Sequence, residues 1–217
     1  YMTGFGNEFE TQALPGALPI GQFTPQKVKY DLYTEQFSST AFTAPRAANR
    51  RTWMYRLRPS VLQGDYHAID NGLIRTAPIT EAVTPPTMLR WNPIDIPTKP
   101  TDFIDGLITM AANGSANGQS GIGIHVYVAN NSMQGRYFYN ADGEMLFVPQ
   151  QGELLLHTEC GKLTVKPGEI AVIPRGIKFS VDLLNDSARG YICENYGHAL
   201  ELAERGPVGA NGYANDR

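Results

Sequence analysis

Residues 139–155 read YNADGEMLFVPQQGELL and residues 166–176 read KPGEIAVIPRG, and these two stretches decide the fold. Each places short apolar runs between Gly, Pro, Asn or Asp, which is the pattern of brief antiparallel strands closed by tight turns. Gly152, Gly168 and Gly176 stand at the turn positions. The two stretches therefore predict a succession of short, turn-linked strands.

The same rhythm extends over residues 123–197. Strands of this length and spacing are typical of an all-β sandwich or barrel. We therefore predict an all-β fold whose regular part, about residues 120–197, is a jelly-roll barrel. The β-prone segments are GIHVYVAN, RYFYN, EMLFVP, GELLLHT, GKLTVKPG, EIAVIP, KFSVDLL and ARGYICENYG.

The spacing of the turn residues is similar to that of the cupins, small antiparallel barrels that hold a metal ion. Their first signature supplies two His and one Glu, and their second supplies a further His, all facing one cavity. Here the first two His positions fall on Phe138 and Asn140 or their neighbours, the Glu position lies within one residue of Glu144, and the last His position is Phe179. We expect a barrel without a metal, in which Glu144 is a solvated strand residue.

The other candidate ligands do not assemble a site in the sequence. A non-haem iron centre needs two His and one carboxylate, and His157 shares a face with Glu159 only if their strand continues towards Gly161. His125 alternates with apolar neighbours, which predicts a hydrogen-bonded histidine in the core or between sheets. We assign no catalytic, cofactor-binding or metal-binding residue to this chain. The remaining histidines lie in loop or poorly patterned segments: His67 and His198.

The amino-terminal part has a different pattern. Residues 1–51 carry Gly and Pro every few positions, interleaved with Phe and Leu, which favours an extended arm on another surface over a flexible tail. Residues 51–61, RTWMYRLRPSV, alternate with a period of two, so they predict a strand with Trp53, Tyr55 and Leu57 on one face.

The middle of the chain predicts only irregular β segments. Residues 101–114, TDFIDGLITMAANG, are compatible with a short helix or a strand. We expect residues 52–217 to form the sandwich or cupin-like barrel, and the arm over residues 1–51 to belong with them to one amino-terminal domain.

Composition bounds the function classes. The chain has 217 residues, 42% hydrophobic and 18% charged, which suits a folded domain. Its formal net charge of −3 gives no electrostatic reason to expect nucleic acid or a membrane surface as partner. No apolar run reaches the ~20 residues of a membrane helix. Because Cys160 and Cys193 cannot make a disulfide framework, we expect free thiols and a cytoplasmic protein.

Long and unusual strings carry a specific resemblance that covers residues 1–217. The chain resembles the homogentisate 1,2-dioxygenase family. The strings are YMTGFGNEFETQALPGALPIGQFTPQ, LYTEQFSSTAFTAPR, WMYRLRPSV, GIHVYVANNSM, FYNADGEMLFVPQQGELLLHTECGKLTVKPGEIAVIPRG and ENYGHALELAERGPVGANG.

The resemblance implies a two-part β protein of the cupin class, in which a carboxyl-terminal domain supplies two His and one Glu to Fe(II). This chain resembles only the first part, so no catalytic residue is carried over to it. It also starts at Tyr1 without an initiator Met, and we expect the iron-binding part to lie outside these residues. The implied reaction of the complete enzyme converts homogentisate and O2 to maleylacetoacetate, a step in tyrosine and phenylalanine catabolism. The fragment alone is expected to be inactive.

The resemblance also implies partners: the carboxyl-terminal part of the same protein, a small aromatic substrate, and further copies in a hexamer built as two trimers. Two alternatives stay open from the residues themselves. One is a metal-free β-barrel that binds a ligand or a partner, or serves assembly, without catalysis. The other is a metal-independent cupin enzyme such as a sugar isomerase, which would need a His to converge with a Tyr or a carboxylate.

Overall fold

The computed structural model describes residues 2–4, 7–10, 29–38, 43–45 and 51–201. Regular structure in these residues is β, apart from two 3-10 turns at Lys29–Asp31 and Ser60–Leu62. The all-β prediction is confirmed. In the same described residues, no helix has the length and apolar character needed to cross a membrane.

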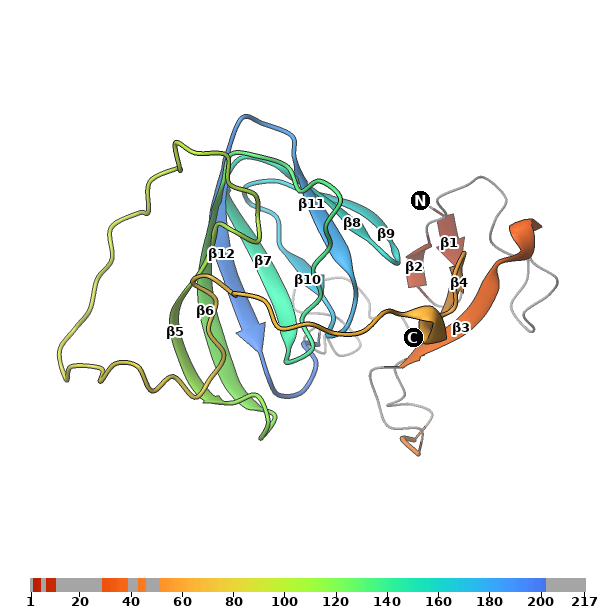
Figure 1. Cartoon of the computed structure of the whole chain (residues 1–217), viewed down its shortest axis with the longest axis horizontal. Coiled ribbons are helices and arrows are strands. Elements are labelled where there is room, and N and C mark those ends of the chain that lie inside the picture. The colour runs from red at the N-terminus through yellow and green to blue at the C-terminus, as the bar shows by residue number, and fades with distance from the viewer. Residues whose placement is uncertain (1, 5–6, 11–28, 39–42, 46–50, 202–217) are drawn as a thin grey trace, which may run out of the picture.

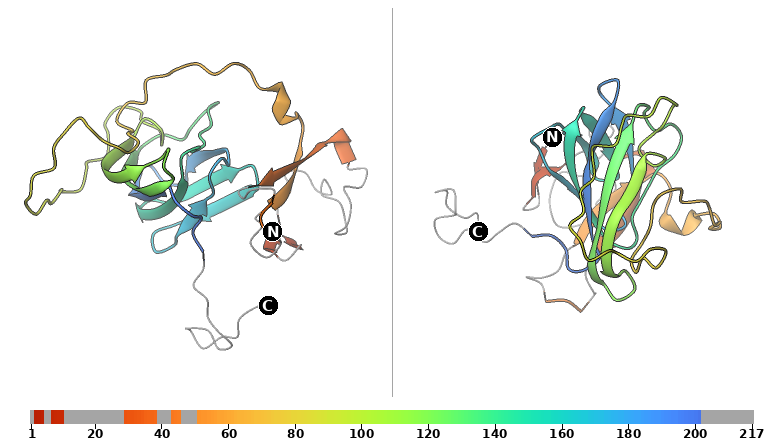
Figure 2. Two further views of the ribbon diagram at one scale, coloured as in Figure 1. Left: turned by 90° about the horizontal axis from the view of Figure 1, so that it is seen from below. Right: turned by 90° about the vertical axis from the view of Figure 1, so that its left-hand side faces the viewer.

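Two antiparallel sheets form a barrel in the carboxyl-terminal half (Figures 1 and 2). Consecutive strands pass repeatedly from one sheet to the other, as they do in a jelly roll. The fold is therefore cupin-like. The larger sheet has the order β10 (Ala171–Ile173), β7 (Glu144–Gln151), β12 (Ala188–Asn195), β6 (Ser120–Ala129) and β5 (Leu107–Ser115). The smaller has the order β11 (Phe179–Leu183), β8 (Leu154–Thr158) and β9 (Gly161–Val165).

The hydrophobic core lies between these sheets. The rings of Phe147 and Phe179 have centroids 5.7 Å apart at an interplanar angle of 82°. Phe103 lies 5.6 Å from Phe147, and all three side chains are at most 1% exposed. Period-two alternation places every second residue of a strand in this core. In β12, for example, Ile192 is fully buried whereas the neighbouring Cys193 is only partly buried.

The predicted turn glycines are confirmed. Gly152 has a φ of 76°, and a Cβ there would stand 2.2 Å from the Ser187 carbonyl oxygen. Gly168 and Gly176 have φ values of 93° and 82°. All three occupy the left-handed region, which side chains other than glycine rarely adopt.

Two of the predicted segments differ in detail. RYFYN is not a strand, because its only ladder contact within the described residues is the bridge between Phe138 and Phe179. Residues 101–114, which were compatible with helix or strand, contribute the edge strand β5. A register irregularity between Thr109 and Ala111 interrupts the alternation of that strand, so its sequence lacks a clear period of two.

Outside the barrel, β3 (Tyr33–Ser38) pairs with β4 (Arg51–Arg56). The predicted strand is present, but its expected apolar face is wrong at two positions: Met54 is 6% exposed and Leu57, beyond the strand end, is 77% exposed. A small ladder joins β1 (Met2–Gly4) to β2 (Asn7–Glu10). Most of the predicted arm over residues 1–51 lies outside the described residues.

Candidate functional site

The metal-ligand positions of the cupin signatures lie at one end of the barrel, and two of them are aromatic. Phe138 and Phe179 exchange two backbone hydrogen bonds of 2.8 Å, each N–H donating to the carbonyl oxygen of the other. Their rings pack edge to face with centroids 5.7 Å apart. Since Phe179 is also fully buried against Phe147, this position belongs to the core.

Asn140, at another His position, shapes the turn before β7. Its Oδ1 accepts hydrogen bonds from the backbone N–H groups of Asp142 at 2.8 Å and Gly143 at 3.1 Å. Its Nδ2 donates to Glu194 Oε1 at 2.6 Å. The amide therefore ties the turn to the carboxylate on β12.

Glu144 is not the solvated strand residue that we expected. It is 7% exposed, and its Oε2 accepts a 2.6 Å hydrogen bond from the Leu200 backbone N–H. This carboxylate points to the outer side of β7, because the inward positions are those of Met145 and Phe147. The correction has a physical reason: the chain returns to β7 after β12 and covers the side chain.

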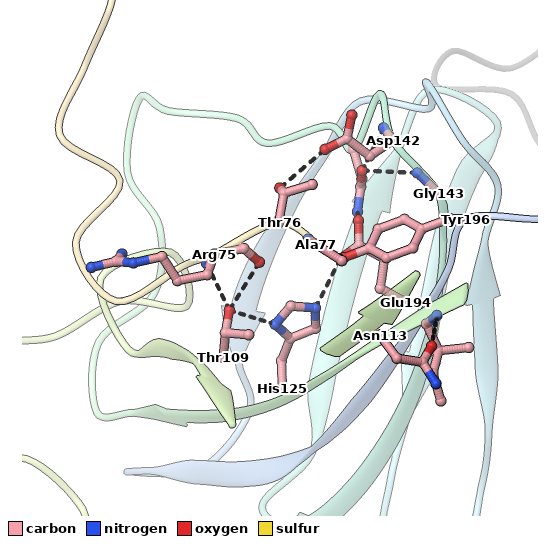
Figure 3. Close-up of polar contacts among 12 residues, drawn as sticks. Arg75, Thr76, Ala77, Thr109, Asn113, His125, Asp142, Gly143, Glu194 and Tyr196 are labelled. Atoms are coloured by element: carbon pink, nitrogen blue, oxygen red, sulfur yellow. Dashed lines mark hydrogen bonds and ion pairs between the residues drawn. The ribbon is translucent and has the colours of Figure 1, made fainter. Parts of the chain in front are cut away.

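His125 and Glu194 form a buried pair on the inner face of the larger sheet (Figure 3). His125 Nε2 lies 3.0 Å from Glu194 Oε2, and His125 Nδ1 lies 3.0 Å from Thr109 Oγ1. With hydrogen on Nε2 the imidazole donates to Glu194, and its Nδ1 is an acceptor for the Thr109 hydroxyl, whose other acceptor is the Arg75 carbonyl oxygen at 3.3 Å. The prediction of a hydrogen-bonded core histidine at position 125 is confirmed, since it is 2% exposed.

Tyr196 extends this polar cluster. Its side chain is fully buried, and its hydroxyl accepts a 3.2 Å hydrogen bond from the Ala77 backbone N–H. Burial raises the pKa of Tyr196 above 10.0, and the Glu194 carboxylate raises it further, both by its charge and by the hydrogen bond between the two side chains. The phenol is thus held neutral beside the carboxylate.

A pocket of about 220 Å³ borders the pair. Of the residues that the structure describes, neither a Lys nor an Arg lines it. Asp142 stands at the rim and accepts a 3.1 Å hydrogen bond from Thr76 Oγ1. The lining residues include His125, Glu194, Phe138, Asn140 and Met145.

The pocket is a poor match to iron. Of the signature positions, Phe138 and Asn140 line the pocket, and Met145 faces it beside the position where a Glu ligand would stand. Among the described residues, no three or more His, Cys, Asp or Glu gather in a way that could hold a metal ion. The donor set of a non-haem iron centre is therefore not assembled at this pocket.

The other sequence candidates lie apart from the pocket. His157 Nε2 pairs with Asp182 Oδ2 at 2.7 Å, on a partly exposed surface. Glu159 instead forms an ion pair with Arg56 at 2.8 Å. Neither cysteine, at positions 160 and 193, forms a disulfide.

The sequence reasoning missed Glu194, Asn140 and Tyr196 as members of one cluster. A signal for Glu194 exists, since it falls on the buried positions of β12 in an otherwise apolar alternation. The structure thereby brings together a His, a Tyr and a carboxylate, the combination that we could not assemble from the sequence.

Comparison with known protein families gives a match over the whole chain. The family model described as "Homogentisate 1,2-dioxygenase N-terminal" matches residues 1–217. The chain belongs to this family. The resemblance found in the sequence is thus confirmed for the amino-terminal portion.

Solved structures similar to this chain include cupins from two organisms. A cupin-2 domain protein from Shewanella frigidimarina is 19% identical, with 34% of this chain and 70% of that chain covered and a TM-score of 0.30. An RmlC-like cupin with a double-stranded β-helix fold from Methanocaldococcus jannaschii is also 19% identical, with 35% and 70% covered and a TM-score of 0.31. The assignment of the barrel rests on the strand order above.

Proposed function

We propose that residues 1–217 are the amino-terminal structural barrel of a homogentisate 1,2-dioxygenase. In the complete enzyme, Fe(II) bound outside these residues would support the oxygen-dependent cleavage of homogentisate to maleylacetoacetate, in the cytoplasmic catabolism of tyrosine and phenylalanine. This barrel would supply scaffold rather than chemistry. Membership of the family supports the proposal.

The observation that carries this role is the replacement of the cupin ligand set by a packed end of the barrel. Phe138 and Phe179 pack edge to face where imidazoles would stand, and Asn140 donates a hydrogen bond to the Glu194 carboxylate. A buried polar cluster whose members satisfy one another stabilises a fold and leaves few free donor atoms for a ligand. This end of the barrel is therefore suited to a structural role rather than to metal binding.

The test compares the complete polypeptide with the 217-residue chain. Iron content by mass spectrometry and oxygen uptake with homogentisate are measured for both, with and without added Fe(II). We expect one iron and iron-dependent uptake for the complete polypeptide, and neither for the chain alone. Stoichiometric iron bound by the chain alone would overturn the scaffold role.

A second candidate is metal-independent acid–base chemistry in the pocket. One observation favours it: His125, Glu194 and Tyr196 converge beneath a cavity. It predicts that Glu194→Gln abolishes an activity while the barrel stays folded. If the barrel is a scaffold, the folded fraction of Glu194→Gln in the complete polypeptide should show the kcat and KM of the parent for oxygen uptake.

We also propose a homo-oligomer, a hexamer of two trimers, in keeping with the family resemblance. Exposed apolar side chains support an assembly role for the irregular segment that precedes β5. Val83 is 95% exposed and Met88 is 102% exposed, and monomers rarely leave many such residues in water. Light scattering of the complete polypeptide gives its mass directly, and a monomer would contradict the proposal.

A further inference from the structure

The face of the larger sheet that points away from the core is unusually apolar. An antiparallel sheet that packs on one side and meets water on the other normally alternates apolar with polar residues. In this sheet the outward positions of paired strands form two apolar rows instead. One row is Ile108, Val126, Tyr191 and Val148. The other is Ala111, Ile124, Cys193, Leu146 and Val172.

These rows, which we call the outer face, have no Asp, Glu, Lys or Arg. They are not sealed by the described residues, since Val172 is still 37% exposed and all other members are partly buried. Burial, together with a hydrogen bond to Cys193, raises the pKa of Tyr191 to about 12. The centre of the sheet therefore presents apolar groups rather than charges to whatever covers it.

Polar side chains border the outer face at both ends. At one end Arg189 donates to Gln150 Oε1 at 3.0 Å and to the Ile94 carbonyl oxygen at 3.1 Å. At the other end Asn195 lies opposite Glu144 in the pairing of β12 with β7. An apolar centre with a polar rim is the usual anatomy of a stable protein interface.

The chain itself turns towards this face as it leaves the barrel. Beyond β12, Asn195 Nδ2 donates to the His198 carbonyl oxygen at 2.6 Å, and the Leu200 N–H donates to Glu144 Oε2 at 2.6 Å. Because Glu144 is on the outward side of β7, the end of the described chain at residue 201 lies beside the outer face.

The sequence of residues 202–217 supplies little apolar surface for two apolar rows. Their sequence, LAERGPVGANGYANDR, offers few large apolar side chains, namely Leu202, Val208 and Tyr213. A charge-free face also gives no electrostatic attraction for a transient partner. A tethered partner, in contrast, covers such a face at any protein concentration, because its effective concentration is set by the connection.

We propose that the outer face is the docking surface for the polypeptide that follows residue 217, the carboxyl-terminal part of the same dioxygenase. This inference rests on the proposed function, and it adds the surface and the chemistry of the contact. The partner meets the outer face with an apolar surface of its own, as one sheet layer meets another about 10 Å away. Its polar groups meet the rim at Arg189 and Glu144.

Cys193 offers a direct probe because it lies in the second row, between Ile124 and Leu146. Alkylation by iodoacetamide is followed with peptide mapping in the 217-residue chain and in the complete polypeptide. Exposed Cys160, in the turn between β8 and β9 of the other sheet, is the internal reference. Covering the face should slow the alkylation of Cys193 by about ten-fold or more, while Cys160 changes by less than about two-fold.

Two results would overturn the proposal. Equal reactivity of Cys193 in both proteins means that the face stays open. If Cys193 is already slow to react in the isolated 217-residue chain, something other than the carboxyl-terminal part covers the outer face. A mass of that chain that doubles as its concentration rises identifies the cover as a second copy. Iron-dependent oxygen uptake is scored separately, so a failed function and a failed docking surface give different results.

A matched pair of variants adds a second readout. Val172→Lys places a charge in the outer face, and Leu163→Lys places one on the edge strand of the other sheet; both side chains are 37% exposed. In the complete polypeptide, Val172→Lys should restore fast alkylation of Cys193 and Leu163→Lys should leave it slow. Identical behaviour of the two variants would count against the docking surface.

Discussion

Glu194 lies directly opposite Gly123 in the pairing of β12 with β6, and its carboxylate fills the space that a side chain at position 123 would need. A Cβ there would stand 2.8 Å from Glu194 Oε2 and 2.8 Å from His125 Nε2. The absence of a side chain at one strand position is therefore what allows the buried pair to form.

Gly123→Ala should lower the free energy of unfolding by about 1–3 kcal/mol, because an added methyl group in a packed site displaces its neighbours. Chemical denaturation of the 217-residue chain measures this loss. Gly118→Ala is the control, since the nearest atom to its added Cβ is 3.5 Å away. The control should stay within about 0.5 kcal/mol of the parent. Equal effects at both positions would refute the steric account of the pair.

Two tyrosines should respond in opposite directions to the same substitution. The Tyr127 hydroxyl is buried and has no hydrogen-bond partner among the described residues, so Tyr127→Phe should stabilise the chain by about 1 kcal/mol. Tyr196→Phe deprives the Ala77 N–H of its acceptor and should destabilise it by about 1–3 kcal/mol. Urea midpoints at neutral pH distinguish the two variants. A loss of stability in both would contradict the absence of a hydrogen-bond partner for the Tyr127 hydroxyl.

Alkaline pH should weaken the fold through Tyr127. Burial raises the pKa of this phenol well above its usual value of 10.0. The pKa of Tyr127 is higher in the folded than in the unfolded state, so the neutral phenol contributes to the free energy of unfolding. This contribution is complete below about pH 10 and is lost as the pH rises towards the folded-state pKa. The free energy of unfolding of the parent should therefore fall more steeply above pH 10 than that of Tyr127→Phe. If the free energy of unfolding falls equally steeply above pH 10 in both proteins, another group causes the loss of stability at alkaline pH.

The link between β4 and the barrel depends on Glu159. This carboxylate pairs with Arg56 at 2.8 Å, and both side chains are 19% exposed, so solvent screens the pair only in part. Glu159→Gln should lower the melting temperature by a few degrees, equivalent to about 1 kcal/mol. Glu81→Gln is the matched control, because its pair with Arg75 is 59% exposed on the carboxylate side. A similar shift of the melting temperature in the control would show that the pair of Glu159 with Arg56 contributes no more than an exposed ion pair.

The strands of the barrel were predictable because their signals are local. Turn glycines such as Gly152 and Gly168 mark where one strand ends, and alternation identifies the faces between them. His125 was predictable for the same reason, since a lone polar residue among alternating apolar ones must be satisfied in the core.

The polar cluster and the burial of Glu144 were not predictable, because they depend on contacts between distant residues. His125 and Glu194 are 69 positions apart and meet only when β6 pairs with β12. Glu144 is covered by Leu200, which returns to it from beyond the last strand. Register between strands is a tertiary property, and a single sequence does not specify which residues will face each other.

The last strand of the barrel, β12, lies in the middle of the larger sheet, between β6 and β7. During synthesis the chain emerges from its amino terminus, so both neighbours of β12 are made before their shared partner exists. Until residues 188–195 arrive, β6 and β7 each present an unpaired edge on which another nascent chain can add a strand. Efficient production of this protein should therefore depend on protecting the nascent chain until residue 195 has been synthesised.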